Sequence, residues 1–192
     1  MFNKLLIVVS SLISSTILKA SIKKKIAKKY FVYEKSIKNN LTIKKINSKV
    51  ILLKKLDHNI SDIDFIILST PMSSYSRIIT SLNKFLTNKA LITDVGSTKK
   101  NVLKLKKNKL NKSLNWILSH PIAGSEVSGP EYGKDTIFDD KWCILIKDKK
   151  TNLRHLSYLN YFWKKIGSKT VVMNSEKHDK IFSITSHLPH LV

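Results

Sequence analysis

Cysteine is nearly absent from this sequence, and several kinds of chemistry are excluded with it. The 192 residues contain a single cysteine, Cys143, so no disulfide can form within the chain and no CxxC metal site can be built. Cys143 lies in the apolar run WCILI at residues 142–146, where we expect a strand and a buried thiol. The fold therefore depends on a hydrophobic core, and a hydrophobic content of 42% is sufficient for one.

Arginine and acidic residues are also scarce. The chain has 35 basic and 13 acidic residues, a formal charge of +22, yet only Arg77 and Arg154 are arginines. The lysines are spread along nearly the whole sequence, whereas proteins that bind nucleic acid favour clustered charge and arginine. We therefore predict no nucleic-acid partner and place the excess lysines on solvated surface. A basic module that binds nucleic acid or an anionic surface is the alternative interpretation.

No hydrophobic run is long enough to cross a bilayer comfortably. The longest apolar stretch, LLIVVSSLISSTIL at residues 5–18, falls short of the required length, so we predict no membrane partner. Following Lys4, this stretch also resembles a signal peptide with cleavage after Ala20, which would make the protein secreted. The same residues predict a buried strand followed by a helix. The pattern of the following residues favours the strand and a cytoplasmic protein.

Apolar runs of strand length alternate with amphipathic stretches of helix length. The predicted strands are Leu5–Val9, Tyr30–Tyr33, Val50–Leu53, Asp64–Leu68, Leu91–Asp94, Trp116–Ser119, Trp142–Ile146 and Thr170–Met173. The predicted helices cover residues 12–28, 73–87, 98–108, 152–166 and 175–186. Strands rich in Ile, Val and Leu that alternate with helices indicate a parallel sheet covered on both faces. The expected fold is thus an α/β, Rossmann-like, doubly wound domain.

The end of the sequence suggests a second unit. We predict a dinucleotide-binding domain over residues 1–174 and the start of a helical dimerisation or substrate domain over residues 175–192. The chain ends at LPHLV within a helical pattern and without a helix-stop signal, so we expect it to be truncated. The segment Pro121–Lys141 carries three of the five glycines, and a loop of that length is commonly functional.

Four segments resemble one enzyme family when they are taken together in order and spacing. They are DVGSTK at residues 94–99, HPIAGSE at 120–126 with SGPE at 128–131, WCIL at 142–145, and HD at 178–179 followed by SHLPH at 186–190. The combination is similar to the prephenate/arogenate dehydrogenases. The resemblance implies an oxidoreductase of tyrosine biosynthesis that oxidises a small-molecule substrate, prephenate or arogenate. It implies NAD or NADP as the cofactor, loss of carbon dioxide, and a homodimer in the complete protein.

The resemblance also implies roles for individual residues. His120 matches the catalytic histidine, and a neutral imidazole can accept the substrate's hydroxyl proton. Ser97 matches a serine that hydrogen-bonds the substrate hydroxyl and this histidine. His187 resembles a substrate-contacting residue, and Gly124 and Ser125 continue the substrate segment. The alternatives are a strand-capping role for His120 and a helix N-cap for Ser97.

The cofactor turn departs from the family pattern, because none of the first ninety residues is glycine. The three glycine positions of GxGxxG hold Val9, Ser11 and Ser14, and the turn itself would run through Leu12 and Ile13. A β-branched residue tolerates positive φ poorly, so Val9 is expected to be strained. The alternative to an active enzyme is therefore an inactive fragment or degenerate relative that no longer binds NAD.

Other cofactor-binding residues are present. Glu34 ends the second predicted strand 25 positions after Val9, near the interval of about 20 in the dinucleotide fingerprint. A carboxylate suits a ribose diol, which favours NAD over NADP, although a solvated glutamate is the alternative. The resemblance adds the turn Thr70-Pro71, and Asp94 and Gly96 of the Asp-x-Gly segment. No metal site is predicted.

Overall fold

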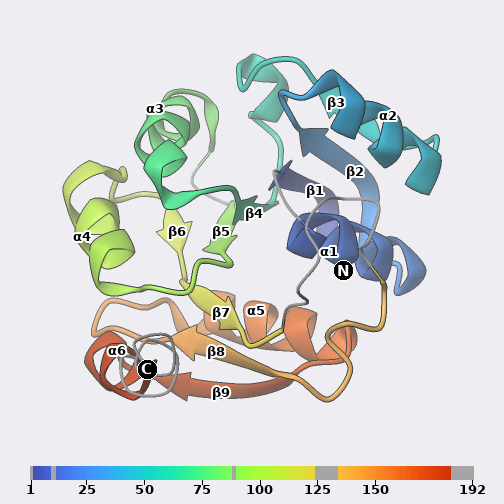
Figure 1. Cartoon of the computed structure of the whole chain (residues 1–192). Helices are drawn as coiled ribbons and strands as arrows, with labels where there is room; N and C mark the ends of the chain where they lie inside the picture. Colours follow the sequence, from blue (N-terminus) through green and yellow to red (C-terminus); the bar gives the residue numbers. More distant parts are fainter. Residues whose placement is uncertain (1, 10–11, 88–89, 124–133, 183–192) are drawn as a thin grey trace, which may run out of the picture.

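The computed structural model of the protein describes residues 2–9, 12–87, 90–123 and 134–182. Its main element is a six-stranded parallel sheet with the strand order β3-β2-β1-β4-β5-β6 (Figure 1). The strands are Phe2–Val9 (β1), Ala27–Tyr33 (β2), Ile51–Leu53 (β3), Phe65–Ser69 (β4), Leu91–Asp94 (β5) and Asn115–Trp116 (β6). This is the strand order of the doubly wound dinucleotide-binding folds, so the predicted fold class is confirmed.

Helices cover both faces of this sheet. The α-helices are Leu12–Lys23 (α1), Ile37–Ile46 (α2), Tyr75–Phe85 (α3), Lys100–Lys109 (α4), Leu153–Lys165 (α5) and Ser175–Phe182 (α6). Two short 3₁₀ turns span His58–Ile60 and Met72–Ser74. Buried residues of α1, α2 and α5 join one hydrophobic cluster with the sheet, and those of α3 and α4 join a second cluster.

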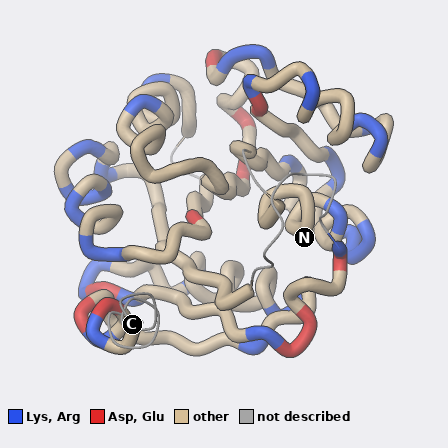
Figure 2. Tube along the Cα trace, in the orientation of Figure 1, with Lys and Arg blue, Asp and Glu red and all other residues tan. Residues whose placement is uncertain are grey.

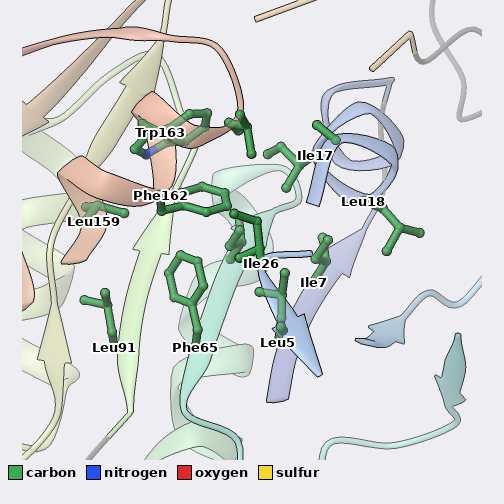
Figure 3. Close-up of a cluster of buried hydrophobic side chains, with 14 of the residues drawn as sticks. Leu5, Ile7, Ile17, Leu18, Ile26, Phe65, Leu91, Leu159, Phe162 and Trp163 are labelled. Carbon is green, nitrogen blue, oxygen red and sulfur yellow. The ribbon is translucent and has the colours of Figure 1, made fainter. Parts of the chain in front are cut away.

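The alternation of side chains along each central strand supplies both clusters. Leu5 and Ile7 of β1 belong to the first cluster, whereas Leu6 and Val8 belong to the second. Strand residues that point to both faces of a sheet must all be apolar when both faces are covered. Figure 3 shows the first cluster, where Phe65 of β4 lies beneath the aromatic residues of α5. The continuous apolar runs of the sequence are therefore explained by burial on two sides.

A second, smaller sheet lies beside the first. It contains Ser119–Pro121 (β7), Trp142–Ile146 (β8) and Lys169–Met173 (β9), with β7 antiparallel and β9 parallel to β8 (Figure 1). The prediction of one strand over Trp116–Ser119 was wrong, because the chain passes from the large sheet to the small one within it. Ile117 N donates to Ile92 O of β5, and Leu118 O accepts from Ile146 N of β8. Adjacent residues thus bond to different sheets.

Helix boundaries differ from the prediction at two places. The first helix was predicted to reach residue 28 but ends at Lys23, and Lys25 has a positive φ of 52° before β2 begins at Ala27. Helix α2 was not predicted. Only Ile43 of α2 is buried, so its hydrophobic periodicity is weak, and the side chain of Ser36 caps it by accepting from Asn39 N.

Gly167 makes the connection between α5 and β9. Its φ is +106°, a conformation that side-chain-bearing residues rarely adopt, and a Cβ there would collide with Asp139. Its carbonyl accepts from Asp140 N at 3.0 Å. Glycine is therefore required at this turn by both backbone conformation and space.

Lysine and arginine positions recur along the described chain, on many separate elements, rather than in one segment (Figure 2). Lysines occur on or beside every helix of the large sheet. This distribution is the one expected of solvated faces. Among the described residues, no helix has the length and apolar character needed to span a membrane.

Candidate active site

A pocket of about 370 Å³ lies at the carboxyl ends of β1, β2 and β4. Its lining comprises Val8, Val9, Tyr33, Glu34, Lys35, Lys55, Leu56, Thr70, Pro71, Ser74, Arg77, Ile78 and Ser81. The order of the strands reverses between β1 and β4, and ligands of open α/β sheets bind outside the carboxyl ends of the strands at such a point. We call this the switch-point pocket.

Four of the predicted cofactor residues line this pocket: Val9, Glu34, Thr70 and Pro71. Thr70 Oγ1 is buried and has no hydrogen-bond partner within the described residues. A buried hydroxyl without a partner is costly, so a ligand group that bonds it would be favoured. The pocket therefore presents one polar group that the protein itself leaves unsatisfied.

The predicted strain at Val9 was wrong. Val9 is the last residue of β1, pairs with Ser69 of β4, and is 5% exposed. Among the described non-glycine residues, only Lys25 and Asp140 have positive φ. Ser14, at the third glycine position, is completely buried in α1, so a serine fits between the helix and the sheet.

The remaining cofactor-turn residues have different positions. Leu12 is buried and Ile13 packs against the first hydrophobic cluster, so both contribute to the core. Ser11 lies outside the described residues. The same holds for the predicted substrate residues Gly124, Ser125 and His187, whose roles stay predictions.

Glu34 is held in place by the start of α2. Its carboxylate accepts from Ser36 N at 2.8 Å and from Asn39 Nδ2 at 3.2 Å, and the side chain is 9% exposed. The pocket also contains three cations, Lys35, Lys55 and Arg77. A carboxylate suits a ribose diol, and cations suit phosphate, so this end of the pocket offers both chemistries.

Asp94, the last residue of β5, forms a fully buried ion pair with Lys99. Lys99 Nζ lies 2.7 Å from Asp94 Oδ2 and 2.6 Å from Ser119 O, and both side chains are 0% exposed. Asp94 also accepts from Gly96 N at 3.2 Å and from Trp116 Nε1 at 3.3 Å. These bonds fix the loop between β5 and α4 and tie it to β7, so the carboxylate of Asp94 is satisfied from within the chain.

The histidine side of the site is built from β7 and α6. His120 Nδ1 of β7 lies 2.9 Å from His178 Nε2 of α6, and His178 Nδ1 lies 2.7 Å from Asp179 Oδ1. Asn174 caps α6 by accepting from Lys177 N, which places His178 in the first turn. Phe182, one turn further along α6, packs its ring 4.9 Å from that of His120.

The side chain of Asp179 also caps the N-terminus of α4. It accepts from Lys99 N at 3.3 Å and from Lys100 N at 2.8 Å, where a helix has backbone amides without an intrahelical partner. The N-cap position of α4 is Lys99, which makes no side-chain cap. The alternative interpretation of Ser97 as the N-cap was therefore wrong. Ser97 is exposed on the loop between β5 and α4.

Burial controls the protonation of the two histidines. Burial, together with the charges of Lys99 and His178, lowers the pKa of His120 to about 3, and the charge of Asp179 opposes this shift. Burial also lowers the pKa of His178, although its hydrogen bond to Asp179 opposes the shift. Both rings are consequently neutral near pH 7. Burial raises the pKa of the Cys143 thiol, which suits a structural cysteine.

The two parts of the site meet between the loops that follow β4 and β5. Thr98 Oγ1 lies 3.3 Å from Met72 Sδ, and a Cβ on Gly96 would lie 3.6 Å from the Met72 side chain. Met72 directly follows Pro71, which lines the switch-point pocket. Gly96 thus lies between Met72 and the carboxylate of Asp94. Within the described residues, no group of three His, Cys, Asp or Glu side chains could hold a metal ion.

Sequence reasoning missed three residues of this arrangement: Lys99, His178 and Asp179. All three belong to the segments that carry the family resemblance, namely 94–99 and 178–179. Their spacing along the chain gave no sign that they meet, because His120 and His178 are 58 residues apart. Only the packing of α6 against β7 and α4 brings them together.

Comparison with known proteins identifies close similarities. The family model for the nucleotide-binding domain of prephenate dehydrogenase matches residues 19–172. The cyclohexadienyl dehydrogenase of Zymomonas mobilis is 31% identical over 133 residues, covering 69% of this chain and 45% of that protein. The prephenate dehydrogenase of Bacillus subtilis is 32% identical over 128 residues, covering 66% of this chain and 34% of that protein.

Solved structures agree with these sequence matches. The prephenate dehydrogenase of A. aeolicus, in complex with hydroxyphenyl propionate and NAD+, superimposes with a TM-score of 0.90 at 29% identity. That match covers 100% of this chain and 66% of the other. The arogenate dehydrogenase of Synechocystis shares the fold with a TM-score of 0.86 at 20% identity. The chain spans less than half of the length of the curated relatives that it matches.

Proposed function

The chain belongs to the prephenate dehydrogenase family, and from this membership we propose that it catalyses the NAD(P)-dependent oxidative decarboxylation of prephenate or arogenate in tyrosine biosynthesis. In this proposal His120 accepts the proton of the substrate's ring hydroxyl. The observation that carries the proposal is the placement of His120, a buried neutral imidazole whose Nδ1 is engaged by His178. Its other ring nitrogen, Nε2, is then available as the proton acceptor.

The residues of the switch-point pocket fit the proposed dinucleotide. Thr70 Oγ1 supplies an unsatisfied buried hydroxyl, Glu34 a carboxylate at the end of β2, and Val9 and Pro71 apolar walls. The cations Lys35, Lys55 and Arg77 would accommodate phosphate, so NADP is compatible alongside NAD. When bound, the cofactor would accept the hydride from the substrate ring. Similarity to a structure that contains NAD+ supports NAD as the cofactor.

The residues of the chain would mainly position the substrate and the cofactor, since formation of an aromatic ring supplies much of the driving force of the reaction. The Asp94–Lys99 pair fixes the loop that carries Gly96 and Ser97. We assign to Ser97 a hydrogen bond to the substrate hydroxyl, in keeping with its exposed position on that loop. An anionic substrate beside His120 would raise the pKa of this histidine and thereby help it to take the proton.

Cofactor binding is the first step to test. NAD should raise the Tm of the chain saturably, because a ligand bound only by the folded state stabilises it by about 2.7 kcal/mol at 100 times Kd. Prephenate should then give reduced cofactor, measured by its absorbance. His120→Gln should keep the Tm rise and lose turnover by a factor of about 10² to 10⁴. Turnover by the variant at the wild-type rate would refute the role of His120.

The second candidate is a domain that keeps the fold without binding NAD. The absence of glycine from the first ninety residues favours it, because Val9 has a side chain where the family pattern has its first glycine. A folded chain whose Tm is unchanged by NAD and by NADP would establish this candidate in place of the enzyme.

Location and assembly follow from the same proposal. We place the protein in the cytoplasm, where biosynthetic dehydrogenases of small metabolites act, with a small-molecule substrate and no nucleic-acid partner. We assign residues 1–174 to the dinucleotide-binding domain and residues 175–192 to the start of a helical domain that forms a homodimer. Sedimentation of a chain that includes the whole helical domain would test the homodimer, since a monomer at micromolar concentration would oppose it.

A further inference from the structure

A line of hydrogen bonds runs from the first turn of α4 to His120. The amides of Lys99 and Lys100 donate to the carboxylate of Asp179, Asp179 Oδ1 lies 2.7 Å from His178 Nδ1, and His178 Nε2 lies 2.9 Å from His120 Nδ1. The imidazole of His178 is completely buried, so no water competes for its nitrogens. The three side chains come from two elements, β7 and α6, that are 58 residues apart in sequence.

The backbone amides of α4 determine which group donates and which accepts in each of these hydrogen bonds. Backbone amides can only donate, so Asp179 accepts at both oxygens and acts as an ionised carboxylate at the positive end of α4. His178 Nδ1 must therefore carry a proton and donate it to Asp179. A neutral His178 then has a lone pair at Nε2, and His120 Nδ1 must be the donor of the next bond.

We infer that Asp179 and His178 are positioning residues that fix the tautomer of His120 with the proton on Nδ1 and the lone pair on Nε2. The catalytic meaning of this inference rests on the proposed function, in which Nε2 accepts a hydroxyl proton. In that step the substrate O–H bond breaks and an N–H bond forms at Nε2. No proton has to move along the line, because His120 Nδ1 keeps its proton throughout.

The same line stabilises the charge that His120 would acquire. The protonated ring would donate more strongly to His178, which is polarised in turn by the carboxylate of Asp179. Lys99 opposes the charge, but its ammonium group is paired with Asp94 at 2.7 Å. The burial that keeps His178 neutral supports the assigned direction, since a doubly protonated His178 would reverse the last bond. Phe182 packs on both rings and limits their rotation.

Heteronuclear NMR of the histidine ring nitrogens tests the inference on the wild-type chain without substrate or cofactor. His120→Gln identifies the His120 signals by their disappearance. At neutral pH the Nδ1 signal should lie at the upfield position of a protonated nitrogen, and the Nε2 signal at the downfield position of a bare one. The reverse pattern, or an averaged pair of shifts, would overturn the inference whatever the activity of the chain.

The substitution Asp179→Asn should reverse the tautomers of His178 and His120. The amide of the new side chain can donate to His178 Nδ1 while its oxygen still accepts from Lys100 N, so His178 would hold its proton on Nε2 and His120 on Nε2. We expect the NMR pattern of His120 to invert. Any dehydrogenase turnover should fall by about two to four orders of magnitude in kcat with little change in KM. An unchanged tautomer in a folded variant would contradict the inference.

Two further variants separate the possible outcomes. His178→Gln keeps an acceptor for His120 Nδ1 and a donor for Asp179, so it should retain the wild-type tautomer even if Asp179→Asn fails to fold. Asp148→Asn is the matched control, because Asp148 pairs with Lys106 at 3.0 Å away from this line. It should leave the His120 spectrum unchanged. An inactive wild type with the expected tautomer would refute the proposed function alone.

Discussion

The switch-point pocket and the histidine side of the site are built in different ways. The pocket takes its shape from the ends of parallel strands, and residues such as Val9 contribute apolar walls rather than particular hydrogen bonds. On the histidine side, every polar group of Asp94, Lys99, His178 and Asp179 described above has a specific partner within the chain.

This difference explains where the family pattern has been kept. A backbone shape survives when valine or serine replaces glycine, provided that the new side chain fits, as Ser14 does in α1. A network of paired side chains does not survive in this way, since removal of one partner leaves another buried group unsatisfied. Substitutions should therefore be tolerated unequally by the two regions.

Removal of the Lys99 ammonium should have the largest effect. Lys99→Met leaves the carboxylate of Asp94 buried without its counter-ion, and breaking a buried pair costs about 3 to 5 kcal/mol. The free energy of unfolding, measured by urea denaturation, should fall by this amount. Lys106→Met is the matched control, because its partner Asp148 is partly exposed and the loss should stay below about 1 kcal/mol. Equal losses would contradict the distinction.

Restoring the family glycine in the large sheet should destabilise the chain. Val9→Gly removes a buried side chain from β1 and loosens the strand, which together cost about 3 kcal/mol. Val172→Gly in β9 is a control, because Val172 is 44% exposed and its loss should be clearly smaller. A gain in the free energy of unfolding for Val9→Gly would mean that Val9 is strained after all.

Replacing a glycine by a larger residue should destabilise the chain at Gly167, where the structure requires glycine. Gly167→Ala places a Cβ against Asp139 at a φ of +106°, and a strained backbone of this kind costs about 2 kcal/mol. Thermal unfolding would measure the loss. Gly96→Ala is the comparison, since its Cβ would lie 3.3 Å from Asp94 Oδ2 without a positive φ. A larger loss of stability for Gly96→Ala than for Gly167→Ala would mean that steric contact with the added Cβ, rather than backbone conformation, causes the strain.

The smallest predicted effect is the change in stability between pH 7 and pH 6. The pKa of His120 is about 3 in the folded chain and near 6.5 when unfolded, so the unfolded state binds more protons between these values. Stability is then complete above pH 6.5 and is lost as the pH falls toward 3. Between pH 7 and pH 6 the loss due to His120 should be below about 1 kcal/mol. His120→Gln should flatten this slope, and an unchanged slope would contradict the prediction.

Much of the large sheet could be predicted from sequence because its strands are apolar on both faces. The cores of β1, β4 and β5 fell within predicted strands for that reason. Helix α2 could not be predicted in the same way, since Ile43 is its one buried residue. The point between β6 and β7 where the chain leaves the large sheet for the small one could not be predicted either. An apolar run does not indicate which sheet each of its residues joins.

The site was predictable to a different degree. His120, Glu34 and Thr70 could be named because a motif or a spacing marked each of them. His178 and Asp179 lie in a motif segment, but the sequence assigned them no role, since their contacts depend on α6 packing against β7 and on the amides at the start of α4. Local patterns thus indicate the candidates, whereas tertiary packing decides which of them come into contact.

The passage between the two sheets has a consequence for how the molecule opens. Ile117 donates its amide to β5, and Leu118 accepts from Ile146 of β8, so one short segment carries a hydrogen bond of each sheet. The small sheet cannot detach without straining the edge of the large one. Native-state exchange of the Ile117 and Ile146 amide hydrogens should consequently report a single cooperative opening, with equal free energies, rather than two independent ones.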